Sequence, residues 1–355
     1  MCRLVVTIAS IVGARPNFVK LKILYEELSH SKARHIIIHT GQHYDYEMSS
    51  VFFEELNLPK PDYYLDVDPG THGQQTGEML KRVEEVLMKE SPNLVIVYGD
   101  TNTTLAGALA AVKLGIPVAH VEAGLRSGER YMAEEINRLL VDHVSELLFA
   151  PTRTSVENLK RENIKGRIIL SGDVMLDLYL KFKDRISISP KGDFVLLTIH
   201  RAENVDNYQR LKDILEAVTS SGYKVVFPIH PRTKMRVKEF GLEKYLRRNN
   251  LEVLDPLSYM NFLKLMGKSR KVVTDSGGVQ KEAYFMGKPC VVLRKRTEWT
   301  EPIEEGLSVL VGWDKRKVRE AIESFEPRKT PNLERFGGGM AGKRIHKEIA
   351  HFLNL

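Results

Sequence analysis

Short apolar runs alternate with amphipathic segments along most of the chain. In the first half, each apolar run is followed by a polar or glycine-containing turn and then by residues with helical spacing. The expected strands are Leu4–Ala9, His35–His39, Leu94–Tyr98, Val118–Val121 and Leu147–Phe149, and the expected helices are Val19–Leu28, Gly73–Met88, Leu105–Leu114 and Glu134–Val144. Nearly all-apolar strands that alternate with helices predict a parallel sheet covered on both faces.

The same pattern starts again after about residue 190. The expected strands are Phe194–Thr198, Val225–Ile229, Leu251–Leu254, Val272–Thr274 and Val291–Leu293, and the expected helices are Leu211–Ser220, Tyr259–Met266, Val279–Met286 and Lys315–Phe325. The segment Ile186–Gly192 indicates a linker. The fold class is therefore α/β, with two doubly wound Rossmann-like domains, 1–185 and 193–335, facing each other across a cleft where ligands bind.

One more helix is expected at the end of the chain, over residues 342–355. It follows a flexible break, Arg335–Met340, that contains three consecutive glycines. We expect this helix to pack back against the first domain, although a helix that covers the second domain fits the pattern nearly as well.

Composition narrows the class of protein. The chain has 355 residues, of which 43% are hydrophobic and 28% charged, as in ordinary globular proteins. The net charge of +7 suits anionic ligands, but no long basic run supports nucleic-acid binding. Two cysteines, Cys2 and Cys290, cannot build a disulfide framework, so a reducing cytoplasm is expected. No apolar window is long enough to cross a membrane.

Acidic residues follow successive strands of the first half. Asp100 lies two residues after one expected strand and Glu122 directly after the next. Glu134 opens the following helix, with Arg138 one turn later on the same face. Because parallel strands end at one edge of a sheet, these carboxylates can converge for proton transfer. The structural alternatives are a helix cap for Asp100 and a surface ion pair for Glu134 and Arg138.

Two turns of the first half carry further polar residues. Arg15 and Lys20 lie at the start of the first helix, where they can bind a phosphate or a carboxylate. An ordinary turn with two solvated cations explains them equally well. Gln42 and His43 follow the second strand and suggest a polar wall of a site. A metal site there has little support, because no paired histidine or cysteine accompanies them.

The second half carries the features that suit a diphosphate. His200 and Arg201 follow its first strand, and His230 follows the next one. The strongest local pattern is Ser276-Gly277-Gly278 between a strand and a helix, where backbone N–H groups can approach phosphate oxygens. Glu282, on that helix, can accept hydrogen bonds from ribose hydroxyls, and Phe262 can pack on a base. A serine-capped helix and a core phenylalanine are the alternatives.

Seven motifs in this order carry a resemblance to a known family. They are Gly13-Ala14-Arg15-Pro16, Gly41-Gln42-His43, Gly99-Asp100-Thr101, His120-Val121-Glu122-Ala123-Gly124-Leu125-Arg126, Glu134-Glu135-Ile136-Asn137-Arg138, His200-Arg201-Ala202-Glu203-Asn204 and Asp275-Ser276-Gly277-Gly278. Over nearly its whole length the chain resembles the non-hydrolysing UDP-N-acetylglucosamine 2-epimerases. The resemblance implies the two-domain GT-B fold, a homodimer, and interconversion of UDP-N-acetylglucosamine and UDP-N-acetylmannosamine with no metal or nicotinamide cofactor.

The resemblance also implies roles for single residues. Arg15, Lys20, Asp100, Glu122 and His200 match the family's substrate site, and Glu134 and Arg138 match its other essential acid and that acid's helical partner. Positions that bind UDP match Phe262, Ser276, Gly277, Gly278 and Glu282. Gln42, His43, Arg201 and His230 match positions near the site or near a regulatory nucleotide-sugar site of bacterial members. Three departures occur: Trp299 for an arginine, Leu257 for a glutamine and Ala133 for a proline.

The expected mechanism is elimination and re-addition of UDP through a 2-acetamidoglucal, with His200 and the three acids as the catalytic candidates. Three alternatives stay open: epimerisation of a UDP-diacetamido uronic acid, glycosyl transfer by a GT-B enzyme, and a catalytically silent nucleotide-sugar sensor. Turnover without an acceptor would separate the epimerases from the other two.

Overall fold

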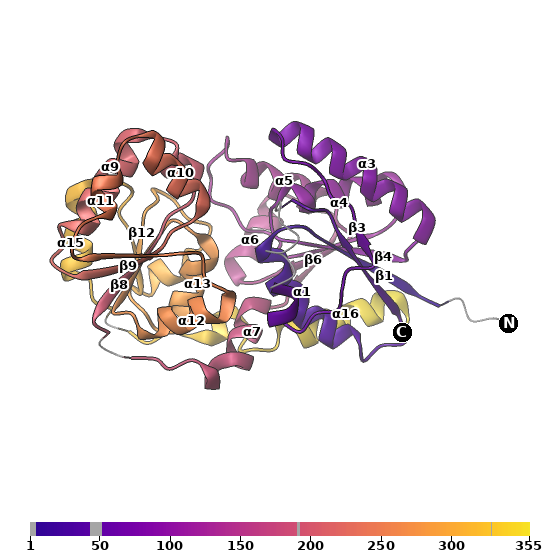
Figure 1. Ribbon diagram of the computed structural model, residues 1–355. Coiled ribbons are helices and arrows are strands. Elements are labelled where there is room, and N and C mark those ends of the chain that lie inside the picture. The colour runs from indigo at the N-terminus through magenta and orange to yellow at the C-terminus, as the bar shows by residue number, and fades with distance from the viewer. Residues whose placement is uncertain (1–4, 43–51, 190–191, 328) are drawn as a thin grey trace. The chain divides into compact units, whose positions relative to one another are not determined.

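The chain forms two compact α/β units. The computed structural model describes residues 5–42, 52–189, 192–327 and 329–355. The first unit comprises Met1–Lys181 together with Leu333–Leu355, and the second comprises Phe182–Asn332 (Figure 1). The predicted fold class is confirmed, because each unit is built on a parallel sheet.

Within the described residues, the first unit has a seven-stranded sheet in the order β3-β2-β1-β4-β5-β6-β7, with every neighbouring pair parallel. Its strands are β1 (Thr7–Val12), β2 (Arg34–His39), β3 (Tyr63–Tyr64), β4 (Leu94–Tyr98), β5 (Val118–Val121), β6 (Leu147–Ala150) and β7 (Arg167–Leu170). Its helices are α1 (Arg15–Leu28), α3 (His72–Glu90), α4 (Asn102–Lys113), α5 (Ala133–Val144), α6 (Arg153–Arg161), α7 (Val174–Phe182), the 3₁₀ helix η2 (Leu333–Phe336) and α16 (Ala341–Leu353).

The second unit repeats this architecture with six described strands in the order β10-β9-β8-β11-β12-β13, again parallel. They are β8 (Phe194–Thr198), β9 (Lys224–Pro228), β10 (Leu251–Leu254), β11 (Lys271–Thr274), β12 (Cys290–Val292) and β13 (Ser308–Leu310). The helices are η1 (Lys183–Arg185), α8 (Ala202–Val205), α9 (Tyr208–Thr219), α10 (Pro231–Glu239), α11 (Glu243–Leu246), α12 (Tyr259–Lys268), α13 (Gly277–Phe285), α14 (Glu301–Glu304) and α15 (Lys315–Ser324).

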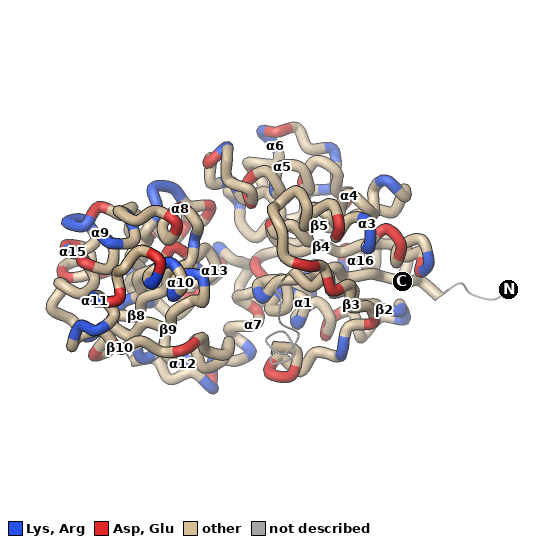
Figure 2. The backbone as a smooth tube through the Cα atoms, turned by 45° about the horizontal axis from the view of Figure 1, so that its top comes forward, with Lys and Arg blue, Asp and Glu red and all other residues tan. Residues whose placement is uncertain are grey.

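The central strands form the core of each unit. All five side chains of β4 and all six of β1 are buried, as expected for strands covered on both faces. Charged residues, blue and red in Figure 2, lie mostly on the helices and loops. No helix in the described part of the chain is both long enough and apolar enough to span a membrane.

Strand β1 lies further along the chain than predicted. Val5 and Val6 precede it, and the six-residue strand runs on to Val12. The polar residue Ser10 lies in the middle of this buried strand. Its hydroxyl is 2.7 Å from both the hydroxyl of Tyr98 and Nε2 of His35, so the group is hydrogen-bonded. Such long-range bonds satisfy a polar group inside a buried strand, whereas the predicted strand ends one residue earlier, at Ala9.

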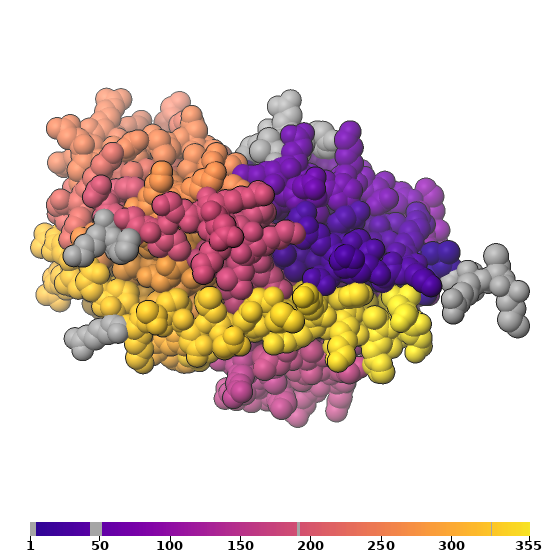
Figure 3. Space-filling view, turned by 90° about the horizontal axis from the view of Figure 1, so that it is seen from below, coloured from indigo at the N-terminus to yellow at the C-terminus, as the bar shows by residue number. Residues whose placement is uncertain are grey.

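The last helix packs against the first unit. Helix α16 contacts α1, and the yellow C-terminal segment lies along the indigo N-terminal part in Figure 3. The carboxylate of Asp177 accepts hydrogen bonds from the backbone N–H groups of Ala341 (3.2 Å) and Gly342 (2.8 Å), which open the helix. A Cβ atom at Gly342 would collide with Ile23 of α1, so this position needs glycine.

Candidate active site

The loops after β4 and β5 bring two acidic residues together in the first unit. Gly99 separates β4 from Asp100 and has a φ of 67°, which glycine adopts without strain. A Cβ atom on Gly99 would lie 2.5 Å from Nζ of Lys20 and 3.2 Å from Oε2 of Glu122. The peptide next to Asp100 therefore lies directly against the side chains of Lys20 and Glu122.

Lys20 and Glu122 form an ion pair. Their side chains are only 5% and 9% exposed, so both charges are largely withdrawn from water. Glu122 also has a φ of 77°, in the left-handed region that side-chain-bearing residues rarely adopt. Its backbone N–H and that of Ala123 both donate to the carbonyl of Phe149 on β6, at 3.1 and 3.0 Å. A strained backbone at a paired, poorly hydrated carboxylate is typical of a functional position.

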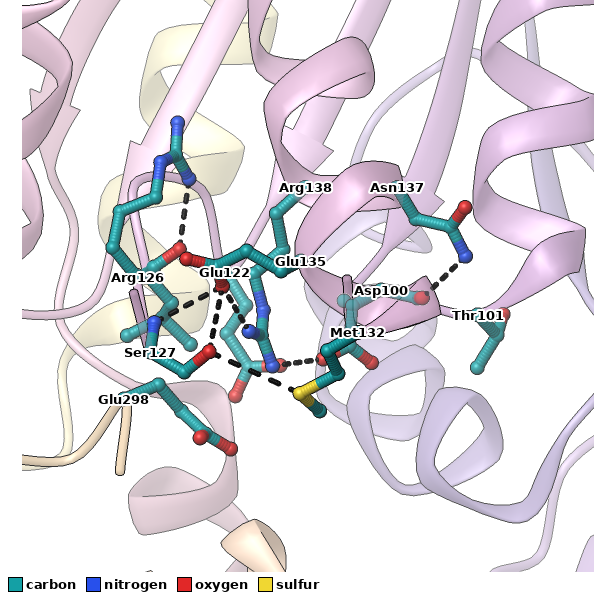
Figure 4. A network of polar contacts seen from close by, with 12 residues as sticks. Asp100, Thr101, Glu122, Arg126, Ser127, Met132, Glu135, Asn137, Arg138 and Glu298 are labelled. Atoms are coloured by element: carbon teal, nitrogen blue, oxygen red, sulfur yellow. Dashed lines mark hydrogen bonds and ion pairs between the residues drawn. The ribbon is translucent and has the colours of Figure 1, made fainter. Parts of the chain in front are cut away.

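Asp100 is held by a second cation. Arg138 of α5, with a side chain 2% exposed, contacts the carboxylate of Asp100 and donates to Glu135 at 2.8 Å (Figure 4). Asn137, beside it on the helix, donates to the backbone carbonyl of Asp100 at 2.9 Å. Helix α5 thus fixes both the side chain and the main chain of Asp100.

Glu135 is a member of this network that the sequence analysis missed. Its carboxylate accepts hydrogen bonds from the N–H groups of Ser127 (3.0 Å) and Gly128 (2.8 Å). Burial opposes its ionisation, but these N–H groups and Arg138 outweigh burial and lower the pKa of Glu135. The predicted acid, Glu134, lies one residue earlier in the first turn of α5 and is half-buried. The spacing of three residues between Glu135 and Arg138 was the available signal.

Two further predicted residues of the first unit, Arg15 and Gln42, follow strands β1 and β2. Arg15 opens α1 with its guanidinium 5.2 Å from the ring centroid of Phe52, and burial lowers its pKa. Gln42 accepts hydrogen bonds from the N–H (3.0 Å) and hydroxyl (2.7 Å) of Thr103, near the start of α4. His43 lies outside the described residues.

A fully buried histidine, His120, contacts the turn that precedes Asp100. The ring of His120 on β5 contacts the carbonyl oxygen of Gly99 through Nε2 and the carboxylate of Asp142 through Nδ1, both at 2.7 Å. The other oxygen of Asp142 accepts from the Gly124 N–H at 3.1 Å and pairs with Arg126 at 2.7 Å. His120 stands in one of the motifs, but nothing local in the sequence identifies Asp142 as its partner.

In the second unit, a buried carboxylate organises the loop after β8. Asp275 accepts hydrogen bonds from the backbone N–H groups of His200 and Arg201, each at 3.1 Å, and from Nδ2 of Asn204 at 3.0 Å. His200 therefore lies at the end of β11 as well as at the end of β8. The rings of His200 and His230 are 5.3 Å apart, so the fold brings these two predicted residues together.

The Ser-Gly-Gly turn opens helix α13. The hydroxyl of Ser276 caps the helix by accepting from the N–H of Val279 at 3.5 Å. Gly277 has a packing reason as well, because a Cβ atom there would collide with Oε1 of Glu298. The first-turn N–H groups and the helix dipole together favour an anion at this end.

Two further predicted residues, Glu282 and Phe262, lie on helices of this unit, and Trp299 contacts α13. Glu282 is buried within α13, and Phe262 is half-buried on α12. Trp299, the departure noted in the sequence, is 2% exposed and has Nζ of Lys281 4.1 Å from its ring centroid. Tryptophan at this position thus packs against α13. In the portion of the chain covered by the structure, no cluster of histidine, cysteine, aspartate and glutamate suits a metal ion.

Comparison with known proteins gives concordant matches over most of the chain. A profile of the UDP-N-acetylglucosamine 2-epimerase family matches residues 26–350. A UDP-N-acetylglucosamine 2-epimerase homolog of Methanococcus maripaludis is 49% identical over 353 residues, covering 95% of this chain and 98% of that protein. The UDP-2,3-diacetamido-2,3-dideoxy-D-glucuronate 2-epimerase of Pseudomonas aeruginosa is 46% identical over 355 residues, covering 97% and 99%.

A solved structure matches equally far. The crystal structure of Methanocaldococcus jannaschii UDP-GlcNAc 2-epimerase in complex with UDP-GlcNAc and UDP superposes with a TM-score of 0.91. That chain is 44% identical, and the match covers 97% of this chain and 99% of that one.

Proposed function

The chain belongs to the UDP-N-acetylglucosamine 2-epimerase family, and from that premise we propose that it interconverts UDP-N-acetylglucosamine and UDP-N-acetylmannosamine. The observation that carries the proposal is the pair of carboxylates after adjacent strands, Asp100 with Arg138 and Glu122 with Lys20. Inversion at a carbon that bears hydrogen requires a proton to leave one face and another to arrive on the opposite face. Two held carboxylates supply that need.

The chemistry proceeds by loss of the nucleotide. The hydrogen on C2 of the sugar is weakly acidic, so direct removal is implausible. In the proposed step the bond between C1 and the diphosphate oxygen breaks, its electron pair leaves with UDP, and a carboxylate takes the C2 proton to give 2-acetamidoglucal. UDP then adds back to C1 while a proton reaches C2 from the other face. Asp100, Glu122 and Glu134 are the candidates for the two proton transfers.

We assign the nucleotide to the second unit. Departing UDP carries negative charge, and the amino end of α13 at Ser276–Gly278 offers N–H groups and the positive end of a helix dipole. His200 and Arg201 follow β8, and Asp275 holds their backbone N–H groups. In this assignment the unit of residues 182–332 binds UDP, and the unit that contains Asp100 and Glu122 acts on the sugar.

Turnover in deuterium oxide tests the mechanism. UDP-N-acetylglucosamine is incubated with the protein alone and followed by proton NMR. We expect UDP-N-acetylmannosamine to form without an acceptor and to carry deuterium at C2, because the proton taken from C2 exchanges with solvent before return. A product that keeps the original hydrogen at C2 would contradict elimination and re-addition.

A second substrate has specific support. The Pseudomonas aeruginosa relative, 46% identical over 97% of this chain, is named for a 2,3-diacetamido glucuronate substrate. That reaction is also an inversion at C2, so it uses the same proton transfers. Parallel assays of both UDP-sugars decide between them, and we propose the larger kcat/KM for UDP-N-acetylglucosamine.

We further propose that the enzyme is a cytoplasmic homodimer that works without a metal ion or nicotinamide. The family resemblance supports the dimer, and the presence of only two cysteines supports a reducing compartment. Sedimentation equilibrium distinguishes a dimer from the 40.5 kDa single chain. Turnover that survives exhaustive chelation checks the proposed independence from metal ions.

A further inference from the structure

The buried ring of His120 uses both of its nitrogens at once. Its solvent-exposed fraction is zero, and so is that of Asp142, so water does not compete for either group. Nε2 contacts the carbonyl oxygen of Gly99, and Nδ1 contacts a carboxylate oxygen of Asp142, both at 2.7 Å. A carbonyl oxygen can only accept, so Nε2 carries a proton.

The second nitrogen decides the charge. If Asp142 is ionised, Nδ1 must also donate, and the ring is an imidazolium with both nitrogens protonated. Asp142 has two further donors on its other oxygen, Arg126 at 2.7 Å and the Gly124 N–H at 3.1 Å, which favour the carboxylate form. Arg126 in turn contacts both oxygens of Glu162, at 2.8 and 2.6 Å. With His120 charged, these four side chains carry two positive and two negative charges.

The strand residues paired with His120 add no further charge to these four side chains. On the neighbouring strands His120 is paired with Val97 of β4 and Leu148 of β6, which are apolar. Helix α5 contributes Asp142, the loop after β5 contributes Arg126, and Glu162 lies just after α6. Burial alone would raise the pKa of Asp142, but the charges of His120 and Arg126 lower it below its ordinary value.

What the ring holds is the turn that carries Asp100. The carbonyl of Gly99 belongs to the peptide that joins Gly99 to Asp100, and Gly99 itself lies against Lys20 and Glu122. His120 also lies on β5, two residues before Glu122, which follows the strand. One buried ring therefore fixes the spacing between the two proposed acids.

We propose that His120 is a positioning residue whose ring, held by Asp142 and donating from both nitrogens, locks the Gly99–Asp100 turn beside Glu122 for epimerisation. This inference rests on the proposed function, although the charge of the ring can be measured independently of it. His120 does not touch the substrate and acts through the placement of Asp100.

Nitrogen NMR of the unchanged protein tests the charge. The chain has 11 histidines, and selective ¹⁵N labelling shows the protonation of each ring. We expect one histidine, assigned by the loss of its signals in His120→Gln, to have both ring nitrogens protonated in the folded protein. A ring with only one protonated nitrogen would overturn the proposal.

A matched pair of variants tests the positioning. In His120→Gln the side-chain amide reaches as far as Nε2 and can still donate to Gly99, whereas in His120→Asn it reaches only as far as Nδ1 and Asp142. Both variants remove the charge. Because a misplacement of about 1 Å can cost about 100-fold in rate, we expect kcat to fall about 100-fold in His120→Asn and about 10-fold in His120→Gln. KM and UDP affinity should change less than about 3-fold in both.

Equal losses of kcat in the two variants would reject the role of the Gly99 contact. A loss confined to thermal stability, with kcat unchanged in the folded fraction, would show that the ring is only structural. If the unchanged protein turns over no UDP-sugar, the proposed function fails, and the NMR spectrum still decides the charge of the ring.

Discussion

Glu122 combines a strained backbone, low exposure and a buried cation partner. We expect Glu122→Gln to lower kcat by about 10²–10⁴-fold, the usual contribution of a positioned acid or base, because the amide cannot take or give the proton. The substitution keeps the size of the side chain but leaves Lys20 without a counter-charge, so stability falls as well. Rate measurements on the folded protein separate the two effects.

The control for this variant is Glu157→Gln, whose side chain is 62% exposed on α6. It removes one carboxylate at the surface and should leave kcat within about 2-fold, since exposed pairs contribute little. Equal rates for Glu122→Gln and the unchanged protein would remove Glu122 from the proposed mechanism.

Two glycines separate backbone strain from close packing. Gly99 and Gly115 have nearly the same φ, 67° and 71°. A Cβ atom added at Gly99 would collide with Nζ of Lys20, whereas one added at Gly115 would have no neighbour within 4 Å. Alanine in this conformation costs about 1–2 kcal/mol at either position. The end of Lys20 can move away from the added methyl group, so the extra effect at Gly99 falls on the ion pair with Glu122.

We therefore expect Gly99→Ala and Gly115→Ala to lose similar free energies of unfolding in denaturant titrations. Only Gly99→Ala should lose activity, by about 100-fold, because the added methyl group displaces Lys20 and with it the carboxylate of Glu122. Comparable kcat values for the two variants would show that the contact between Gly99 and Lys20 has no part in turnover.

At the scale of the elements, apolar patterning predicted the central strands because those strands are buried on both faces. It missed β3, β7 and β13, which have two to four residues and carry partly exposed side chains at or near the sheet edges. Helices α6 and α7 were missed too, although Thr152 caps α6 in the expected way. Short edge elements are stabilised by neighbours that a local pattern does not contain.

In the site, too, the local sequence pattern predicted some residues but not their distant partners. Residues that follow strands could be predicted, because parallel strands end at one edge. Their partners could not: Asp142 lies 22 residues from His120, and Asp275 lies 75 residues from His200. The structure supplies these long-range bonds, and they fix where each predicted residue points.

The contact between β1 and β2 makes the first unit sensitive to acid. Burial lowers the pKa of His35 to about 4, from an ordinary value of 6.5, and its Nε2 lies 2.7 Å from the hydroxyl of Ser10 on β1. The unfolded chain therefore binds a proton at this residue between pH 6.5 and 4, whereas the folded chain does not. Stability from this residue is present above pH 6.5 and is lost progressively as the pH falls towards 4.

We expect the free energy of unfolding of the first unit to fall by about 2 kcal/mol between pH 7 and pH 5 through this residue. Urea titrations of His35→Gln should show a smaller pH dependence by that amount, and the exposed His351→Gln on α16 should behave like the unchanged protein. An identical pH dependence in all three proteins would mean that His35 does not titrate in this way.

At the scale of the whole chain, each unit has its own sheet and its own apolar core, so a ligand of one unit need not stabilise the other. UDP lacks the N-acetylhexosamine of the substrate, and the proposed assignment places its phosphates at the amino end of α13 and the loop after β8. We expect saturating UDP to slow amide hydrogen exchange most in residues 198–205 and 274–285, because ligand binding stabilises only the structure that it contacts. Uridine without phosphates should give much weaker protection at the same concentration. Protection greatest in residues 94–144, around Asp100 and Glu122, would reverse the assignment of nucleotide and sugar to the two units.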